Sequence, residues 1–221
     1  MLVLLPPSEG KTPPRRGRPL DLAALAHPEL TAHREALLDA LDPGLRSAPT
    51  ARASAIYTGV LYQRLRLPEL PLRARRRVLI ASALWGMLRP DDRIPAYKLS
   101  ISARLPRVGG LAAYWRPALS KALPASGLVV DLRSGGYAAA WRPAGAEIVD
   151  VRAFTELPDG RRAPVSHMVK STRGMVARLL LEAPAPPEDA AGVAELIGAA
   201  GHEAELARAR DGWSLDIVQR A

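Results

Sequence analysis

The stretch MLVLLPPSEGKT (residues 1–12) decides the fold class, because it holds a short apolar segment that ends abruptly in polar residues. Residues 2–5 form a continuous apolar run that stops at two prolines, which is typical of a buried strand. Polar residues directly after such a strand lie at a sheet edge, where binding groups are commonly placed. We therefore expect the strand to deliver Ser8, Glu9 and Lys11 to one edge of a sheet. The alternative is an ordinary solvated loop.

The polar end of this stretch matches two catalytic or binding motifs only in part. Gly10, Lys11 and Thr12 spell the end of a nucleotide-binding P-loop, but the glycine required five residues earlier is replaced by Leu5. The prolines in between have no N–H to offer a phosphate. Ser8 and Lys11 also have the Ser-x-x-Lys spacing of acyl enzymes, which requires a helical turn that the prolines and Gly10 disfavour.

Length and composition favour one globular domain. The 221 residues are enough for one substantial domain or two small ones, and 48% of them are hydrophobic. The sequence has no cysteine, which excludes disulfides, thiolate zinc sites and cysteine nucleophiles. No signal peptide is recognised, and no apolar run approaches the roughly 20 residues that span a bilayer. We expect a cytoplasmic protein without a membrane segment.

The chain is strongly basic, with 31 Lys and Arg residues against 22 Asp and Glu residues and a net charge of +9. Such an excess favours polyanionic partners such as nucleic acid or phosphorylated ligands. The alternative is that the excess reflects the arginine-rich composition that a GC-rich genome encodes. The placement of the charges must therefore decide between these explanations.

Strand and helix patterns alternate along the whole chain. Helices are predicted at 29–41, 109–123, 173–183 and 188–198, and a helix or a strand-to-helix turn at 55–65. Strands are predicted at 127–134, 146–154, 165–170 and 213–220, with a hairpin turn at 158–164. No break in composition divides these elements. The sequence therefore predicts one mixed α/β (α+β) domain over residues 1–221, with a mixed sheet flanked by helices.

The histidines do not form a metal site in the sequence. His27, His33, His167 and His202 are scattered, and no His, Asp or Glu cluster has ligand spacing. His167 lies in the predicted strand 165–170, where a packed histidine is more common than a catalytic base. We therefore expect no metal and no cofactor.

A second candidate binding segment follows the predicted strand 165–170. Lys170 and Arg173 would lie at the junction between the end of this strand and the start of the following helix. The positive end of the helix dipole would then add to their charges. An anion would be stabilised there. The alternative is ordinary N-capping by Ser171 or Thr172, which is compatible with binding.

The segment ASALWGMLRPDD (residues 81–92) is similar to two short helices meeting at Gly86, the layout of helix–hairpin–helix modules that grip a DNA backbone. Such hairpins favour two glycines, and Ala83 stands where the other is expected. Tyr57 and Tyr97 lie near basic residues in the sequence, and aromatic rings in such positions can stack on bases. The alternative for these tyrosines is half-buried packing.

Six blocks of the sequence carry a family resemblance. They are LLPPSEGKT (4–12), IYTGVLYQRL (56–65), ALWGMLRPDDRIPAYKLSISARL (83–105), LAAYWRPALSKAL (111–123), LVVDLRSGGY (128–137) and MVKSTRGMVARLLLE (168–182). Their order resembles that of the YaaA family of bacterial peroxide-stress proteins. The resemblance covers residues 1 to about 182 and is specific, because six separate blocks agree in order.

The resemblance implies a single mixed α/β domain with a basic cleft and a helix–hairpin–helix-like element around Gly86. It also implies DNA binding and a role in limiting oxidative damage when peroxide and free iron would attack DNA. The cleft residues that it implies, block by block, are Ser8, Glu9, Lys11, Tyr57, Arg89, Tyr97, Lys98, Arg104, Ser134, Lys170 and Arg173.

The sequence therefore favours a monomeric DNA-binding stress protein over an enzyme. Backbone contacts to duplex or distorted DNA are expected, since no helix has the Asn/Arg pattern of a major-groove reader. An alternative is an enzyme on a nucleotide or nucleobase-like substrate in the same cleft, with Glu9, Ser8 and Lys11 as catalytic candidates. A carboxylate facing DNA phosphates weakens binding unless it serves chemistry or orients a cation. A structural or protein-binding role is a third alternative.

Overall fold

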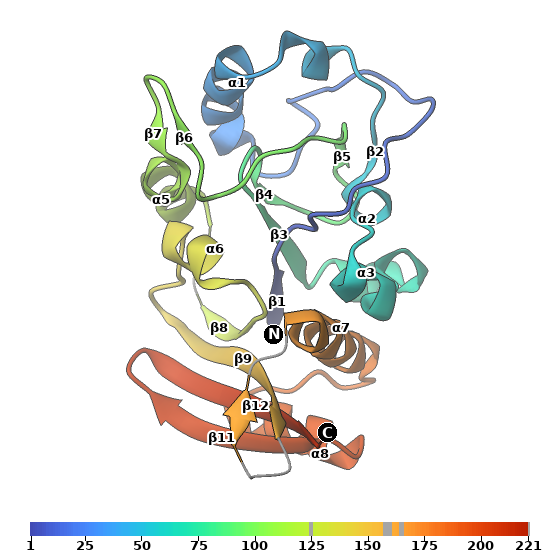
Figure 1. Cartoon of the computed structure of the whole chain (residues 1–221), viewed down its shortest axis with the longest axis vertical. Coiled ribbons are helices and arrows are strands. Elements are labelled where there is room, and N and C mark those ends of the chain that lie inside the picture. The colour runs from blue at the N-terminus through green and yellow to red at the C-terminus, as the bar shows by residue number, and fades with distance from the viewer. Residues whose placement is uncertain (124–125, 157–160, 164–165, 221) are drawn as a thin grey trace.

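The computed structural model describes residues 1–123, 126–156, 161–163 and 166–220, and these residues form an eight-stranded sheet with helices around it (Figure 1). The strand order is β11-β12-β9-β8-β1-β3-β4, with β10 paired to β9. The sheet strands are β1 (Leu2–Leu5), β3 (Val78–Ser82), β4 (Gly86–Leu88), β8 (Gly127–Asp131), β9 (Ala146–Glu156), β10 (Arg162–Ala163), β11 (Glu203–Ala209) and β12 (Gly212–Arg220).

Helices and two small ribbons complete the described chain. The α-helices are α1 (Thr31–Ala40), α2 (Ala53–Ile56), α3 (Val60–Leu65), α4 (Leu72–Arg75), α5 (Leu111–Ala122), α6 (Gly135–Ala140), α7 (Ser166–Glu182) and α8 (Ala190–Ala199). Short 3-10 turns are η1 (Pro28–Leu30), η2 (Pro43–Arg46) and η3 (Leu67–Glu69). The ribbons pair β2 (Ala51–Arg52) with β5 (Arg93–Ile94), and β6 (Arg104–Leu105) with β7 (Gly109–Gly110).

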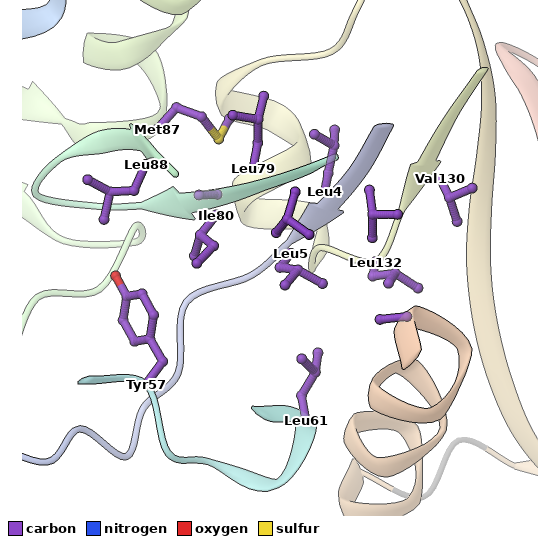
Figure 2. Close-up of a cluster of buried hydrophobic side chains, with 14 of the residues drawn as sticks. Leu4, Leu5, Tyr57, Leu61, Leu79, Ile80, Met87, Leu88, Val130 and Leu132 are labelled. Carbon is purple, nitrogen blue, oxygen red and sulfur yellow. The ribbon is translucent and has the colours of Figure 1, made fainter. Parts of the chain in front are cut away.

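Strand β1 lies in the middle of the sheet, with a parallel neighbour on each side. Val3 pairs with Val78 of β3 and with Val130 of β8. A strand covered on both faces reads as a continuous apolar run, and Val3, Leu4 and Leu5 are fully buried. Figure 2 shows side chains of β1, β3, β4 and β8 meeting in one hydrophobic cluster. The predicted strand at residues 2–5 is confirmed.

The direction in which the chain adds strands reverses at β1. From β1 the chain moves to β3 on one side, and later returns across β1 to β8 and β9 on the other side. Because β1, β3 and β8 are parallel, their carboxyl ends meet at one edge of the sheet. In open α/β sheets, such a switch point is the common place for ligands.

Most predicted elements are confirmed. The mixed α/β fold class is correct, and α1, α5, α8, β8, β9 and β12 lie where the sequence predicts them. The predicted segment 55–65 holds two short helices, α2 and α3. The predicted turn at 158–164 falls mostly outside the described residues. Strand β11 was not predicted, because its charged and alanine residues, EAELARA, give little apolar signal.

The prediction of a strand at 165–170 is wrong. Residues 166–170 belong to α7, which begins at Ser166 and packs against α3. The helix is so close to α3 that a Cβ on Gly174 would lie 2.4 Å from the carbonyl oxygen of Leu61. Six alternating residues were too short a window to reveal this longer helix. Lys170 and Arg173 therefore lie inside α7, so their predicted position at a junction between a strand and the start of a helix is also wrong.

The prediction of two short helices meeting at Gly86 is wrong as well. Residues 78–88 form the antiparallel hairpin of β3 and β4, with Ser82 paired to Gly86. Gly86 has a φ of 72°, and a Cβ there would lie 2.7 Å from Cζ3 of Trp115. The glycine thus serves a left-handed backbone against an indole ring.

A buried ion pair fixes the chain after β8. The Nε and Nη2 atoms of Arg133 donate to the two carboxylate oxygens of Asp131 at 2.9 and 2.7 Å, and both side chains are almost fully buried. Arg133 also donates to the carbonyl oxygens of Tyr137 and Trp141. The pair therefore holds the segment that carries Ser134 and Tyr137.

We expect Arg133→Met to lower the free energy of unfolding by about 3–5 kcal/mol, because it leaves the Asp131 carboxylate buried and uncompensated. Urea denaturation at neutral pH measures the loss. Arg152→Met is the matched control, since it removes a bidentate pair with Asp216 in which Arg152 is 53% exposed. That change should cost at most about 1 kcal/mol. Equal losses in the two variants would contradict the assignment.

Candidate binding pocket

A pocket of about 810 Å³ opens at the carboxyl ends of β1 and β8. Five segments contribute to it: the loop after β1, the start of α3, the segment before the β6–β7 ribbon, the loop after β8 together with α6, and α7. The described lining residues are Pro6, Pro7, Ser8, Glu9, Gly10, Lys11, Gly59, Val60, Leu61, Tyr62, Lys98, Leu99, Ser100, Ile101, Ser134, Tyr137, Lys170 and Arg173.

The pocket brings together most of the residues that the sequence singled out. Seven of the predicted cleft residues line it, namely Ser8, Glu9, Lys11, Lys98, Ser134, Lys170 and Arg173. Tyr57 and Tyr97 lie behind the wall, in contact with Lys11. Segments far apart in the sequence therefore meet at one edge of the sheet.

The loop after β1 is fixed by hydrogen bonds to the segment that precedes α3. The buried Ser8 Oγ accepts from the backbone N–H of Gly59 at 2.7 Å. The N–H of Thr58 donates to the carbonyl oxygen of Gly10, and Lys11 forms a β-bridge with Tyr57. The loop is thus held extended beside another segment rather than curled around a phosphate, in agreement with the sequence argument against a P-loop.

Lys11 points back over this loop. Its Nζ donates to the carbonyl oxygen of Ser8 at 2.6 Å and lies 4.6 Å from the centroid of the Tyr97 ring. Burial lowers the pKa of the Lys11 ammonium, and the nearby Glu9 carboxylate opposes that shift. The aromatic face and the carbonyl oxygen both favour the charged form. Lys11 is therefore a half-buried cation with a fixed position.

A chain of hydroxyl groups supports the ring beneath Lys11. The hydroxyl of Tyr97 lies 2.9 Å from that of Tyr57 and 2.7 Å from Ser82 Oγ, which accepts from the backbone N–H groups of Leu84 and Trp85. Burial raises the pKa of Tyr97 to about 12, and that of Tyr57 well above its ordinary value. Both phenols stay protonated near neutral pH, so they position Lys11 rather than act as bases.

The pocket has charged groups at two depths. At the mouth, Lys170 Nζ lies 3.4 Å from Oε2 of Glu9, whose side chain is 91% exposed. Such a solvated pair contributes little to stability. Deeper, Arg173 is half-buried and donates from Nε to the carbonyl oxygen of Val151 at 3.4 Å. Burial lowers the pKa of Arg173, while Asp131 and Asp150 oppose that shift.

Comparison with known proteins places the chain in a family. A family model described as "Peroxide stress protein YaaA" matches residues 43–195. The UPF0246 protein SCO2297 of Streptomyces coelicolor is 40% identical over 255 aligned positions, which cover 99% of this chain and 98% of that protein. The UPF0246 protein CE1889 of Corynebacterium efficiens is 39% identical, with 95% and 97% covered. The chain belongs to the YaaA family of peroxide stress proteins.

Membership in the YaaA family confirms the resemblance carried by the six sequence blocks, and it supports a stress-related role. Two cleft residues implied by that resemblance lie away from the pocket. Arg89 follows β4, which runs antiparallel to β3, so it lies near the start of β3 and donates to the carbonyl oxygens of Arg76 and Val78. Arg104 is exposed on the β6–β7 ribbon.

Some lining residues of this YaaA-family pocket carried no signal in the sequence. Leu61, Tyr62 and Ile101 are buried, while Val60 is half-buried and lines the wall at the start of α3. Apolar residues that line a cavity look the same in sequence as those that fill the core. Among the described residues, no group of three His, Asp or Glu side chains could hold a metal ion. No described helix has the length and apolarity to cross a bilayer.

The contact between Ser8 and Gly59 gives a test of this loop arrangement. A Cβ on Gly59 would lie 2.3 Å from Ser8 Oγ, so Gly59→Ala should displace that hydroxyl and lower the free energy of unfolding by about 1–3 kcal/mol. In a Ser8→Ala background the clash is absent, and the same change should cost less. Denaturant unfolding of the four proteins measures the coupling, expected to exceed about 0.5 kcal/mol.

Gly10→Ala is the matched control, because its new Cβ would meet only ordinary contacts, the nearest being Gly59 N at 3.6 Å. It should leave stability nearly unchanged. Strictly additive effects of the Ser8 and Gly59 changes would show that the hydroxyl does not occupy this position.

Proposed function

We propose that this YaaA-family chain binds DNA without sequence preference through the mouth of the pocket, and that it limits oxidative damage linked to free iron during peroxide stress. One observation carries the proposal: cations from separate segments meet at the pocket. Among the described residues that line it, Lys11, Lys98, Lys170 and Arg173 stand against the single carboxylate of Glu9. The chain as a whole carries a net charge of +9.

The exposed cations are the ones suited to phosphate contacts. Lys98 and Lys170 are exposed at the mouth, where long flexible side chains can follow a nucleic-acid backbone. Contacts of this kind neutralise phosphates and release counterions, and they carry no information about base sequence. The half-buried Lys11 and Arg173 add to the positive field behind them.

Glu9 is compatible with this role because it is paired and solvated. Its carboxylate lies beside Lys170 and remains almost fully exposed, so moving it away from an approaching phosphate requires little desolvation. In this role Glu9 orients Lys170 at the mouth and does not have to be desolvated when a phosphate approaches.

The double variant Lys170→Glu with Arg173→Glu tests the proposal. We expect it to weaken binding of a labelled DNA duplex at least about tenfold and to reduce the slope of log K against log salt by about 1, because Lys170 is the phosphate contact that is lost and Arg173 contributes to the field behind it. Fluorescence anisotropy over a salt series measures both quantities.

Lys121→Glu with Arg210→Glu is the matched control, with the same charge change on exposed residues. Lys121 is near the end of α5, before β8, and Arg210 lies between β11 and β12, so both are near the opposite edge of the sheet. This control should keep most of the affinity. If both double variants bind duplex equally, the pocket is not the DNA site.

A further inference from the structure

The interior of the pocket differs in character from its mouth. We call the exposed residues Glu9, Lys98, Ser134 and Lys170 the rim, and the residues Leu61, Tyr62 and Ile101 the floor; each floor residue is at most 8% exposed. Contacts to a DNA backbone involve only the rim. The apolar floor and the volume above it are left without a role by the proposed function.

The volume suits an organic ligand larger than a phosphate. About 810 Å³ falls within the roughly 300–1,000 Å³ of pockets that bury most of a small molecule. The walls are mainly apolar, with Val60, the half-buried Tyr137 ring and the floor as its surfaces. A flat ring system can be buried on such surfaces, since aromatic stacking tolerates different bases.

Three cations lie where such a ligand would carry a negative charge. Within the described part of the chain, Lys11 Nζ donates only to the Ser8 carbonyl oxygen, and Arg173 donates only from Nε. An ammonium has three donors and a guanidinium five, so both keep donors for a phosphate oxygen. Lys170 at the rim adds a third charge. A terminal phosphate, with a charge of about −1.5 to −2, matches this set.

Position in the fold points to the same class of ligand. The pocket lies at the carboxyl ends of β1 and β8, at the place where the strand order reverses. Nucleotides commonly bind at this point of open α/β sheets. The hydroxyls of Ser100 and Ser134 add polar partners for a sugar between the phosphate and the base.

We propose that the pocket interior binds one nucleoside-phosphate unit, with its phosphate on Lys11, Arg173 and Lys170 and its base over the floor. This goes beyond binding to a DNA backbone. The unit comes either from a free mononucleotide or from a single nucleotide of a DNA strand that leaves its stack.

Calorimetry on the full chain tests the ligand class with AMP, adenosine and ribose 5-phosphate. AMP should bind at least about tenfold more tightly than either fragment, because only AMP uses both the cations and the floor. Arg173→Gln should weaken the binding of AMP at least about fivefold and leave the affinity for adenosine unchanged. Equal binding of AMP and ribose 5-phosphate would overturn the base site, and no binding of AMP at millimolar concentration would overturn the proposal.

Val60→Trp places an indole in the interior and should abolish AMP binding. Val108→Trp is the matched control, because Val108 is a half-buried valine between β6 and β7 that does not line the pocket. If AMP binds to the Val60→Trp variant with the same affinity as to the wild-type chain, the pocket is not the AMP site. Circular dichroism checks the fold of both variants, and the Arg173→Gln result decides the matter if Val60→Trp is unfolded.

Duplex binding by the same variants separates the two sources and the two proposals. If Val60→Trp loses AMP binding but keeps its affinity for duplex DNA, the ligand of the pocket is a free mononucleotide. Parallel loss of both assigns it to a nucleotide of the DNA strand. A wild-type chain that binds duplex but not AMP keeps the proposed function and refutes this inference, whereas one that binds AMP but no duplex does the reverse.

Discussion

The pairing of β1 with a parallel strand on each side is the constraint on which the site depends. It buries Val3, Leu4 and Leu5 completely, so the polar residues that follow can only emerge at the carboxyl edge of the sheet. The parallel direction of β8 brings Ser134 to the same edge. The strand order reverses at β1, and a crevice commonly forms outside the carboxyl ends of the strands at such a switch point. The pocket is thus a consequence of strand order rather than of any single motif.

The cations at this edge are held in place by neutral and aromatic partners. Lys11 lies between a carbonyl oxygen and the Tyr97 ring, and Arg173 donates to a backbone carbonyl oxygen. The carboxylates of Glu9, Asp131 and Asp150 act on these two cations only from a distance, since no ion pair of either cation is formed within the described part of the chain. By contrast, the buried Arg133 is neutralised by Asp131 two residues before it. The Arg133–Asp131 ion pair therefore fixes the chain after β8, whereas Lys11 and Arg173 contribute positive charge to the pocket. Positive charge that is preorganised and partly desolvated attracts anions more strongly than the same charge in water.

How far the sequence predicts this arrangement depends on how local each signal is. The run at residues 2–5 predicts a buried strand, and the polar residues after it predict a binding edge; the structure places Ser8, Glu9 and Lys11 in the pocket. Arg89 was misplaced because its position depends on the antiparallel direction of β4, which no local pattern reveals. Gly86 was assigned to a helical hairpin because its contact with Trp115 of α5 is visible only in the fold. The floor could not be predicted, since Leu61 and Ile101 look in sequence like any core residue.

The position of Glu9 at the mouth is compatible with the proposed binding of a phosphate group. The carboxylate sits at the mouth, 3.4 Å from Lys170, in a pair that water screens almost completely. In the proposed complex, an arriving phosphate would replace the carboxylate on that ammonium and would also contact Lys11 and Arg173, whereas Glu9 would return to solvent at little cost. A carboxylic acid ligand would make the same exchange with only one charge to offer. The proposed site, with one exposed acid against the three cations Lys11, Lys170 and Arg173, would therefore favour ligands with a dianionic group over ligands with a single negative charge.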